Sequence, residues 1–125
     1  MKLTRRHTMK RASEFAMVRA EGSSAAGRFL VLSSAPLPAA AVSETPATES
    51  RFGIITTRKL GHAVVRNLLR RRVREILRAH GEPLSTGRYV VVIPRIHAAT
   101  ASYEQLERDF KKQMQRLLRA EKQAC

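Results

Sequence analysis

Residues 58–78 read RKLGHAVVRNLLRRRVREILR, the most strongly patterned stretch of the chain. From position 62 onward the apolar residues recur at helical spacing, which predicts an amphipathic helix over 62–79. Its apolar side carries Val65, Leu69, Val73, Ile76 and Leu77. The opposite side carries Arg70, Arg71, Arg74 and Arg78 with Asn67, and the two borders carry Arg66 and Arg72. One face can therefore pack on a core while the other presents guanidinium groups.

The charge on this helix points to an anionic partner. The stretch holds eight of the 24 basic residues and a single acid, Glu75. Three arginine pairs are spaced i, i+4, and like charges at that spacing destabilise a helix. A face that only keeps a helix soluble normally mixes both signs. Because arginine suits bidentate contacts with phosphate, we interpret the row as a nucleic-acid-binding face.

Composition agrees with that interpretation. The chain has 125 residues, enough for one domain with its own core, and a net charge of +14. No apolar run approaches the ~20 residues of a membrane-spanning helix, and the basic N-terminus lacks the apolar core of a secretory signal. The lone cysteine, Cys125, excludes a disulfide framework and is typical of the reducing cytoplasm. We expect a cytoplasmic protein with a phosphate-rich partner and no membrane contact.

The remaining pattern divides the chain into an arm, one domain and a tail. Residues 1–12 are predicted to be a flexible basic arm with five cations and no acid. Residues 13–120 form the predicted domain, and 121–125 the tail. A short helix begins at the N-cap Ser13, with Phe15 and Val18 on one face, and ends before Gly22.

Three apolar segments, 28–33, 51–57 and 88–93, predict strands, with a further short strand near Ala25. The proline-rich stretch 35–50 predicts a long loop, and Gly53 indicates a bulge or a close backbone approach. A last helix runs from Ser102, which opens a capping box, to about Arg119. Its mixed charges predict an ordinary solvated outer surface. The fold class is α+β, a two-layer sandwich with about four strands in the order α-β-β(-β)-α-β-α. The general handedness rule predicts a right-handed crossover around the arginine-rich helix.

The sequence offers no catalytic constellation. The only aspartate, Asp109, lies on a helix with a structural pattern, and the glutamates are scattered. The four histidines are too far apart for a metal site, and we expect them to be unpaired at the surface. No nucleophile motif or phosphate-binding glycine loop is present. The residues by themselves therefore predict a binding protein with no catalytic residue and no bound metal.

The segment 52–75, FGIITTRKLGHAVVRNLLRRRVRE, resembles the protein subunit of bacterial ribonuclease P. The remaining elements match in order over nearly the whole chain. The resemblance implies a left-handed crossover around the arginine helix, and here we follow it over the general rule. It also implies that a catalytic RNA, with Mg²⁺, removes the 5′ leader of precursor tRNA. The protein would bind both RNAs, hold no cofactor itself and need no protein partner.

The resemblance also implies which residues bind. The face for the catalytic RNA would be Arg58, Lys59, Arg66, Asn67, Arg70, Arg71 and Arg74. The leader cleft would be Phe15, Arg28, Thr56 and Phe29, or Leu30 in place of Phe29. Aromatic floors with basic rims suit unstacked single strands.

The sequence departs from the family pattern at three places, and two other functions remain open. Leu68 stands where the family carries a cation, with Arg72 nearby, and Arg19 replaces an expected aromatic residue. The loop at 35–50 is also longer than the family needs. The alternatives are a ribosomal protein or RNA chaperone without a role in cleavage, and a protein nuclease that acts without RNA.

Overall fold

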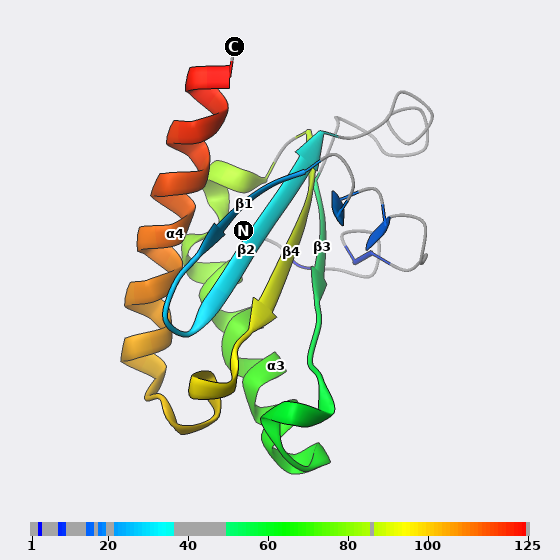
Figure 1. The fold of residues 1–125 in the computed structure, drawn as a ribbon, viewed down its shortest axis with the longest axis vertical. Helices are drawn as coiled ribbons and strands as arrows, with labels where there is room; N and C mark the ends of the chain where they lie inside the picture. The colour runs from blue at the N-terminus through cyan, green and yellow to red at the C-terminus, as the bar shows by residue number, and fades with distance from the viewer. Residues whose placement is uncertain are drawn as a thin grey trace.

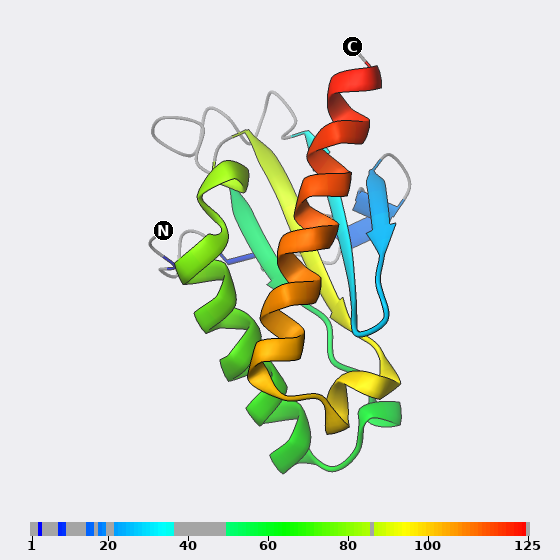
Figure 2. The same cartoon turned by 90° about the vertical axis from the view of Figure 1, so that its left-hand side faces the viewer.

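A four-stranded sheet with two long helices on one face forms the fold (Figure 1). The strands are β1 (Ser23–Ala26), β2 (Leu30–Pro36), β3 (Arg51–Ile54) and β4 (Arg88–Pro94). The long helices are α3 (Ala63–His80) and α4 (Tyr103–Ala124), and the short 3-10 turns are η3 (Arg58–Leu60), η4 (Glu82–Leu84) and η5 (Ile96–Thr100). The two long helices lie side by side over the sheet (Figure 2). The predicted two-layer α+β sandwich is confirmed.

The structure is a computed structural model, and it describes residues 3, 8, 9, 15, 16, 18, 19, 22–36, 50–85 and 87–124. Several sequence predictions lie outside these residues. They are the five cations of the N-terminal arm, the N-cap Ser13, most of the loop (37–49) and the terminal Cys125. No described helix combines the length and the apolar character needed to cross a membrane.

The crossover around α3 is left-handed. The sheet order is β1-β2-β4-β3, and β3 pairs in parallel with β4, with Gly53 opposite Val91. In Figure 1 both strands point downward, β4 lies to the left of β3, and α3 lies behind the sheet. Figure 2, turned by 90°, places α3 on the side that was behind. The hand implied by the family resemblance is therefore confirmed, and the hand predicted by the general rule is wrong.

Both faces of β4 are covered, which explains its unbroken apolar sequence. Successive side chains of a strand alternate between faces, so Val90 and Val92 join the core under the helices. Tyr89 and Val91 join a second cluster on the other face, with Met9, Val18 and Ala35. The helix-side core is filled mainly by fully buried apolar side chains: Leu30, Leu32, Leu69, Val73, Ile76, Leu77, Leu84, Leu106, Phe110 and Leu117.

Thr8 and Met9 lie along the outer edge of β3. The backbone N–H of Met9 donates to the carbonyl of Phe52 at 2.8 Å, and Thr8 forms a parallel bridge with Phe52. Phe15 packs on the second cluster. An edge strand presents unpaired N–H and C=O groups, and a neighbouring segment that pairs with them removes this liability. The expectation of a flexible arm is therefore wrong at Thr8 and Met9, which are docked.

The predicted strand 28–33 is displaced to Leu30–Pro36 because a tight turn precedes it. The N–H of Gly27 donates to the carbonyl of Leu30 at 2.8 Å, which places Arg28 and Phe29 in the turn between β1 and β2. Asp109 of α4 holds this turn. Its Oδ2 accepts the backbone N–H of Phe29 at 3.0 Å and that of Leu30 at 2.9 Å. Its Oδ1 accepts the side-chain amide of Gln113 at 3.1 Å.

Most helix boundaries agree with the sequence predictions. The capping box at the start of α4 is formed: Gln105 N–H donates to Ser102 Oγ at 3.1 Å, and Ser102 N–H donates to Gln105 Oε1 at 2.9 Å. The helix runs on to Ala124, beyond the predicted end near Arg119. The predicted strand 51–57 ends early, at Ile54, although the N–H of Ile55 still donates to the carbonyl of Val92 at 3.0 Å.

One histidine prediction is wrong. His80, at the end of α3, lies 2.8 Å from a carboxylate oxygen of Glu107 on α4. The hydrogen bond from His80 lowers the pKa of Glu107, and the charges of His80 and Lys111 act in the same direction. This contact links the C-terminal end of α3 to the first half of α4.

Candidate nucleic-acid interface

Helix α3 is divided lengthwise into a buried face and a cationic face. Leu69, Val73, Ile76 and Leu77 are buried, and Val65 is half-buried. The outer side chains Arg70, Arg71, Arg74 and Arg78 are exposed, while Arg66 and Arg72 at the borders are half-buried. The helix begins at Ala63, two residues after Gly61, which has a φ of 132°, and ends at His80, just before Gly81. The predicted orientation of the helix is confirmed, since the anchored apolar face holds the arginines outward.

Acidic residues of the protein neutralise little of the charge on the exposed arginines of α3. Glu75 bonds Arg78 at 2.6 Å, near the C-terminal end of α3. Arg70 donates to the side-chain oxygen of Asn67 at 3.2 Å, a neutral acceptor. Within the described part of the chain, no carboxylate lies in ion-pair contact with Arg70, Arg71 or Arg74. These three guanidinium groups are therefore available to external phosphates.

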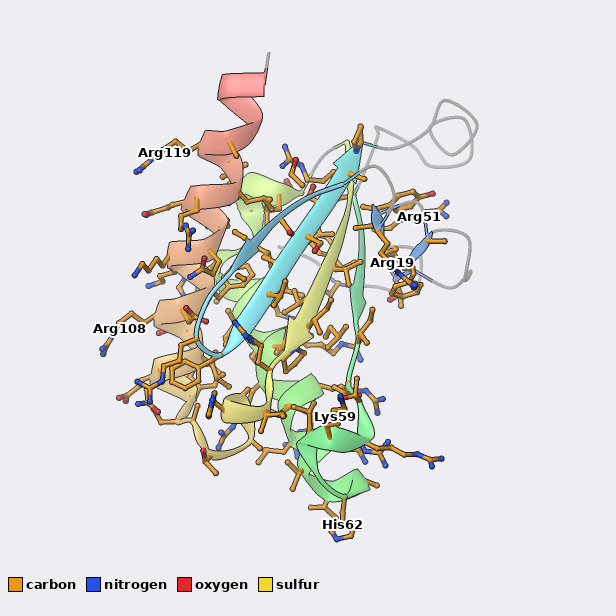
Figure 3. All side chains as sticks on the ribbon, viewed as in Figure 1. Arg19, Arg51, Lys59, His62, Arg108 and Arg119 are labelled. Carbon is orange, nitrogen blue, oxygen red and sulfur yellow. The ribbon has the colours of Figure 1, made fainter. Side chains whose placement is uncertain are left out.

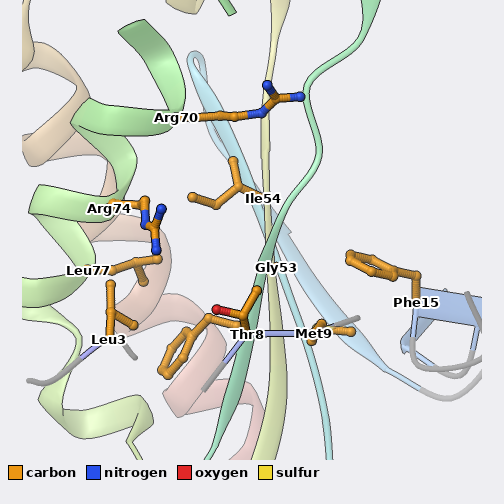
Figure 4. A pocket seen from close by; sticks show the side chains of 10 residues that line it. Leu3, Thr8, Met9, Phe15, Gly53, Ile54, Arg70, Arg74 and Leu77 are labelled. Atoms are coloured by element: carbon orange, nitrogen blue, oxygen red, sulfur yellow. The ribbon is translucent and has the colours of Figure 1, made fainter. Parts of the chain in front are cut away.

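A first concave site lies between α3, β3 and the N-terminal segment (Figure 4). It is a pocket of about 220 Å³ with Arg70 and Arg74 reaching toward it from the helix. Its other lining residues are largely apolar: Leu3, Thr8, Met9, Phe15, Phe52, Gly53, Ile54 and Leu77. The pocket therefore combines an apolar floor with a cationic rim, which suits a single-stranded nucleic acid.

Gly53 allows Phe15 to approach the backbone of β3. A Cβ atom at Gly53 would lie 2.6 Å from Cε1 and 2.8 Å from Cζ of the Phe15 ring. The sequence prediction of a close approach at this glycine is confirmed, and the approaching group is an aromatic side chain.

A second concave site lies between α3 and the start of α4. This groove of about 600 Å³ is lined by Leu68, Arg71, Arg72, Arg74, Glu75, Arg78 and Tyr103. Arg74 lines both concave sites. Burial of the Tyr103 phenol, followed by the charges of Glu107 and Glu75, raises its pKa above the ordinary value for tyrosine. Arg72 lies one helical turn after Leu68, the residue that stands where the family carries a cation. Its guanidinium donates to the carbonyl of Ala101 at 3.1 Å.

Three predicted site residues lie just before or at the start of α3. Arg58 and Lys59 are exposed on η3, which leads into the helix. Thr56 is half-buried between β3 and η3. Its Oγ1 and the Nε of Arg66 are buried without a hydrogen-bond partner among the described residues. The region that leads into α3 therefore presents two exposed cations, Arg58 and Lys59, beside two buried polar atoms that have no hydrogen-bond partner among the described residues.

The structure does not bring Arg28 and Phe29 together with Phe15. The guanidinium of Arg28 lies 5.5 Å from the centroid of the Phe29 ring, at the β1–β2 turn. Phe29 packs on the helix-side core, whereas Phe15 packs on the opposite face of the sheet. By strand geometry, roughly 16 Å separates this turn from Gly53 beneath the Phe15 ring. The predicted leader residues thus form two separate groups, and their role remains a prediction.

Sequence reasoning missed several residues of the two concave sites. Leu3, Thr8 and Met9 were assigned to a flexible arm, yet they line the first pocket. Tyr103, at the start of α4, packs half-buried against the helix-side core and also lines the groove beside α3. An apolar residue within the basic arm, such as Leu3, was the available signal for docking. Nothing in the local sequence indicated that Tyr103 faces arginines of another helix.

The described residues offer no protein-held metal site. No group of three or more His, Cys, Asp or Glu side chains is placed to hold a metal ion in the part of the chain that the structure describes. Asp109, the only aspartate, is already engaged with the β1–β2 turn.

Comparison with known proteins gives a consistent result. The family model described as Ribonuclease P matches residues 3–118. The ribonuclease P protein component of Acidothermus cellulolyticus is 32% identical over 92% of this chain and 91% of that protein. That of Halalkalibacterium halodurans is 32% identical over 84% of this chain and 82% of that protein.

Solved structures that are similar to this fold belong to the same family. The RNase P protein of Staphylococcus aureus has a TM-score of 0.74 at 25% identity, over 87% of this chain and 93% of that one. The RNase P protein of Thermotoga maritima has a TM-score of 0.68 at 26% identity, over 84% and 92% of the two chains. The left-handed crossover, the exposed arginine row and these matches agree, and the chain belongs to the family of bacterial ribonuclease P protein components.

Proposed function

We propose that this protein binds the catalytic RNA of ribonuclease P and the 5′ leader of precursor tRNA, and that the RNA performs the cleavage. The observation that carries the proposal is the arginine row of α3, which is exposed while Leu69, Val73, Ile76 and Leu77 on the opposite side of the helix are buried. A rigidly held row of guanidinium groups is suited to bidentate contacts with a folded, phosphate-rich partner. Membership of the family supplies the partner: an RNase P RNA.

The proposed face for the catalytic RNA runs from η3 along α3. It comprises Arg58, Lys59, Arg66, Asn67, Arg70, Arg71 and Arg74. All except Arg66 are exposed, and Arg66 is half-buried. Asn67 holds Arg70 through a hydrogen bond of 3.2 Å, which restricts the orientation of that guanidinium. Leu68 leaves the groove side of the helix without the expected cation, and Arg71 and Arg72 line the same groove.

The proposed leader site is the pocket that contains Phe15, with Thr56 nearby in sequence. The Phe15 ring offers a surface for an unstacked base, and Arg70 and Arg74 offer contacts for its phosphates. Arg28 and Phe29 lie at the far end of the sheet. A leader that contacts Phe15 therefore reaches them only if it runs along the strands.

We assign the Mg²⁺ requirement of cleavage to the RNA. The described side chains do not fit a metal site, as no cluster of ligands is present among them. The contribution of the protein is then binding and orientation of RNA, without a proton-transfer step at any of its own side chains. We expect it to act in the cytoplasm, where precursor tRNA is processed.

Reconstitution tests this function. Purified protein alone is expected to leave precursor tRNA intact. The same protein with a bacterial RNase P RNA is expected to release the 5′ leader at a low Mg²⁺ concentration at which the RNA alone is nearly inactive. The reason is that cations of the protein reduce repulsion between the two RNAs. The measurement is the rate of leader release on a denaturing gel.

The same assay separates the alternative functions. Cleavage by protein that has been freed of RNA would support a protein nuclease and contradict the proposal. Tight binding to ribosomal RNA, without any rescue of cleavage, would support a ribosomal protein or an RNA chaperone. A matched control is the protein with Arg70 and Arg74 replaced by alanine, which is expected to rescue cleavage poorly.

A further inference from the structure

The two acidic residues in the middle of α4, Glu107 and Asp109, form hydrogen bonds with other parts of the protein. Oε2 of Glu107 lies within hydrogen-bonding distance of Nε2 of His80 on α3, at 2.8 Å. Asp109 accepts two backbone N–H groups of the β1–β2 turn and the amide of Gln113. Both carboxylates point toward neighbouring elements and are half-buried. They are therefore not available to neutralise the outer surface of the helix.

Between Gln105 and Ala120 the exposed side of α4 consequently carries only positive charge, and the exposed Glu104 lies one turn before Arg108. From Gln105 to Ala120, each exposed residue of the helix is a cation, a glutamine or an alanine: Gln105, Arg108, Lys111, Lys112, Gln115, Arg116, Arg119 and Ala120. The mixed charges in the sequence predicted an ordinary solvated surface. That prediction is wrong for this stretch, because the acids face inward and the cations face outward.

The outermost cations form a stripe of defined geometry. Arg108, Lys112, Gln115 and Arg119 are spaced i, i+4, i+7 and i+11, so they lie on one side of the helix. At a rise of 1.5 Å per residue, the stripe is about 16 Å long. Figure 3 shows Arg108 and Arg119 extending away from the sheet, on the opposite side of the molecule from Arg19 and Arg51. We call these four residues the α4 stripe.

From Arg108 onward the cations of the α4 stripe and its flank repel one another, and the only exposed acid on this side from Tyr103 to Ala120 is Glu104, four positions before Arg108. Arg108 and Lys112 are like charges at i, i+4, and so are Lys112 and Arg116. Of the flanking cations, Arg116 donates to Gln113 at 3.0 Å, a neutral acceptor. The strands under this side, β1 and β2, contain no acid. An external polyanion is what would relieve this repulsion.

We propose that the α4 stripe binds the phosphate backbone of the catalytic RNA, at a place separate from the contact made by α3. A membrane surface also attracts cations, but a membrane-binding helix needs large apolar residues beside its basic ones. The exposed side of α4 between Gln105 and Ala120 has none. RNA phosphates need only charge and hydrogen-bond donors, which arginine and lysine supply.

This inference rests on the proposed function, since it takes the same RNA as partner. The α3 and α4 cations are nevertheless distinct groups, because the groove that contains Tyr103 lies between the two helices. One RNA could contact both helices if its folded surface spans the groove. The two contacts would then contribute separately to affinity and to its salt dependence.

The test uses the full chain and an RNase P RNA without precursor tRNA. The triple variant Arg108→Gln, Lys112→Gln and Arg119→Gln removes the three cations of the stripe. Affinity is measured between about 50 and 200 mM salt. Loss of three phosphate contacts is expected to reduce the salt slope by about two to three units and to weaken binding at least tenfold at the low end of the range. The single variant Lys112→Gln is measured as well and is expected to reduce the slope by about 0.7 to 0.9 units. Its charge-matched control is Arg19→Gln, on the opposite side of the molecule, which is expected to leave the slope unchanged.

A second measurement locates the contact. In a Cys125→Ser background, Gln115→Cys places a single thiol in the middle of the stripe without removing a cation. A photo-crosslinker on this thiol is expected to attach to the RNA. An unchanged slope in the triple variant, or an absence of crosslinked RNA, would overturn the inference while leaving the proposed function intact if Arg70→Ala still weakens binding. If the triple variant no longer bound phosphatidylserine vesicles that the parent protein binds, while the salt slope of its RNA binding stayed unchanged, the stripe would instead be assigned to a membrane surface.

Discussion

Replacement of both Arg70 and Arg74 by alanine is expected to produce the largest loss of RNA affinity in this protein. Both side chains are exposed, both line the pocket that contains Phe15, and Arg74 also lines the groove beside α4. A hydrogen bond to a charged group contributes about 1.5 kcal/mol at the low end. Two such losses correspond to roughly a 100-fold weaker complex with the catalytic RNA. The salt slope should fall by about 1.4 to 1.8 units.

A third arginine of the same helix provides the control. Arg78 is also exposed on α3, but Glu75 bonds it at 2.6 Å. Arg78→Ala therefore removes a cation that is partly neutralised, and its effect on the salt slope should be smaller than that of Arg70→Ala. Equal effects from the two single variants would mean that only net charge matters, and would contradict a specific face. Circular dichroism should show unchanged helix content in each variant, since none of these side chains contributes to the core.

Asp109→Ala is expected to cause the largest loss of stability, about 3 kcal/mol in the free energy of unfolding. The carboxylate accepts the backbone N–H groups of Phe29 and Leu30 at 3.0 and 2.9 Å. Alanine would leave both donors without a partner in a partly buried place, and each lost bond to a charged acceptor costs about 1.5 kcal/mol or more. The measurement is the midpoint of urea unfolding, with the slope of the transition expected to stay constant.

Two variants show whether the acceptor itself is responsible. Asp109→Asn keeps one oxygen as an acceptor and should lose about half as much stability. Arg108→Ala changes the adjacent, exposed residue and should stay within about 0.5 kcal/mol of the parent protein. If Asp109→Ala is as stable as Arg108→Ala, the turn is held by something other than this carboxylate. Gly27 belongs to the same arrangement, since a Cβ there would lie 2.3 Å from Asp109 Oδ1.

Features decided by local pattern could be predicted from the sequence. The helical spacing from Val65 to Leu77 predicted both the bounds of α3 and its buried face, because a helix is built from contacts three and four residues apart. The capping box at Ser102 and Gln105 is likewise local, and its two hydrogen bonds are formed. Resemblance to the family supplied the left-handed crossover, which no local rule predicts.

Features decided by distant partners could not be predicted. The start of β2 depends on Asp109, which lies 80 positions after Phe29 and accepts the backbone N–H groups of Phe29 and Leu30. The docking of Thr8 and Met9 depends on the free edge of β3, which no local pattern of the arm reveals. The charge of the α4 surface depends on which way its acids face, and Glu107 faces His80, 27 positions away. The composition of α4 therefore could not predict that one side of this helix is cationic.

The most direct test of the central claim is chemical modification of individual arginines in the presence and absence of the catalytic RNA. Phenylglyoxal reacts with accessible guanidinium groups, and mass spectrometry of peptides reports the rate at each site. Arg70, Arg71 and Arg74 are expected to react readily in the free protein and to be strongly protected in the complex. Arg19 should react equally in both states, and Arg72, half-buried and bonded to Ala101, should react slowly in both. Equal rates at Arg70, Arg71 and Arg74 with and without RNA would contradict the account, because the row on α3 would then lie outside the RNA contact.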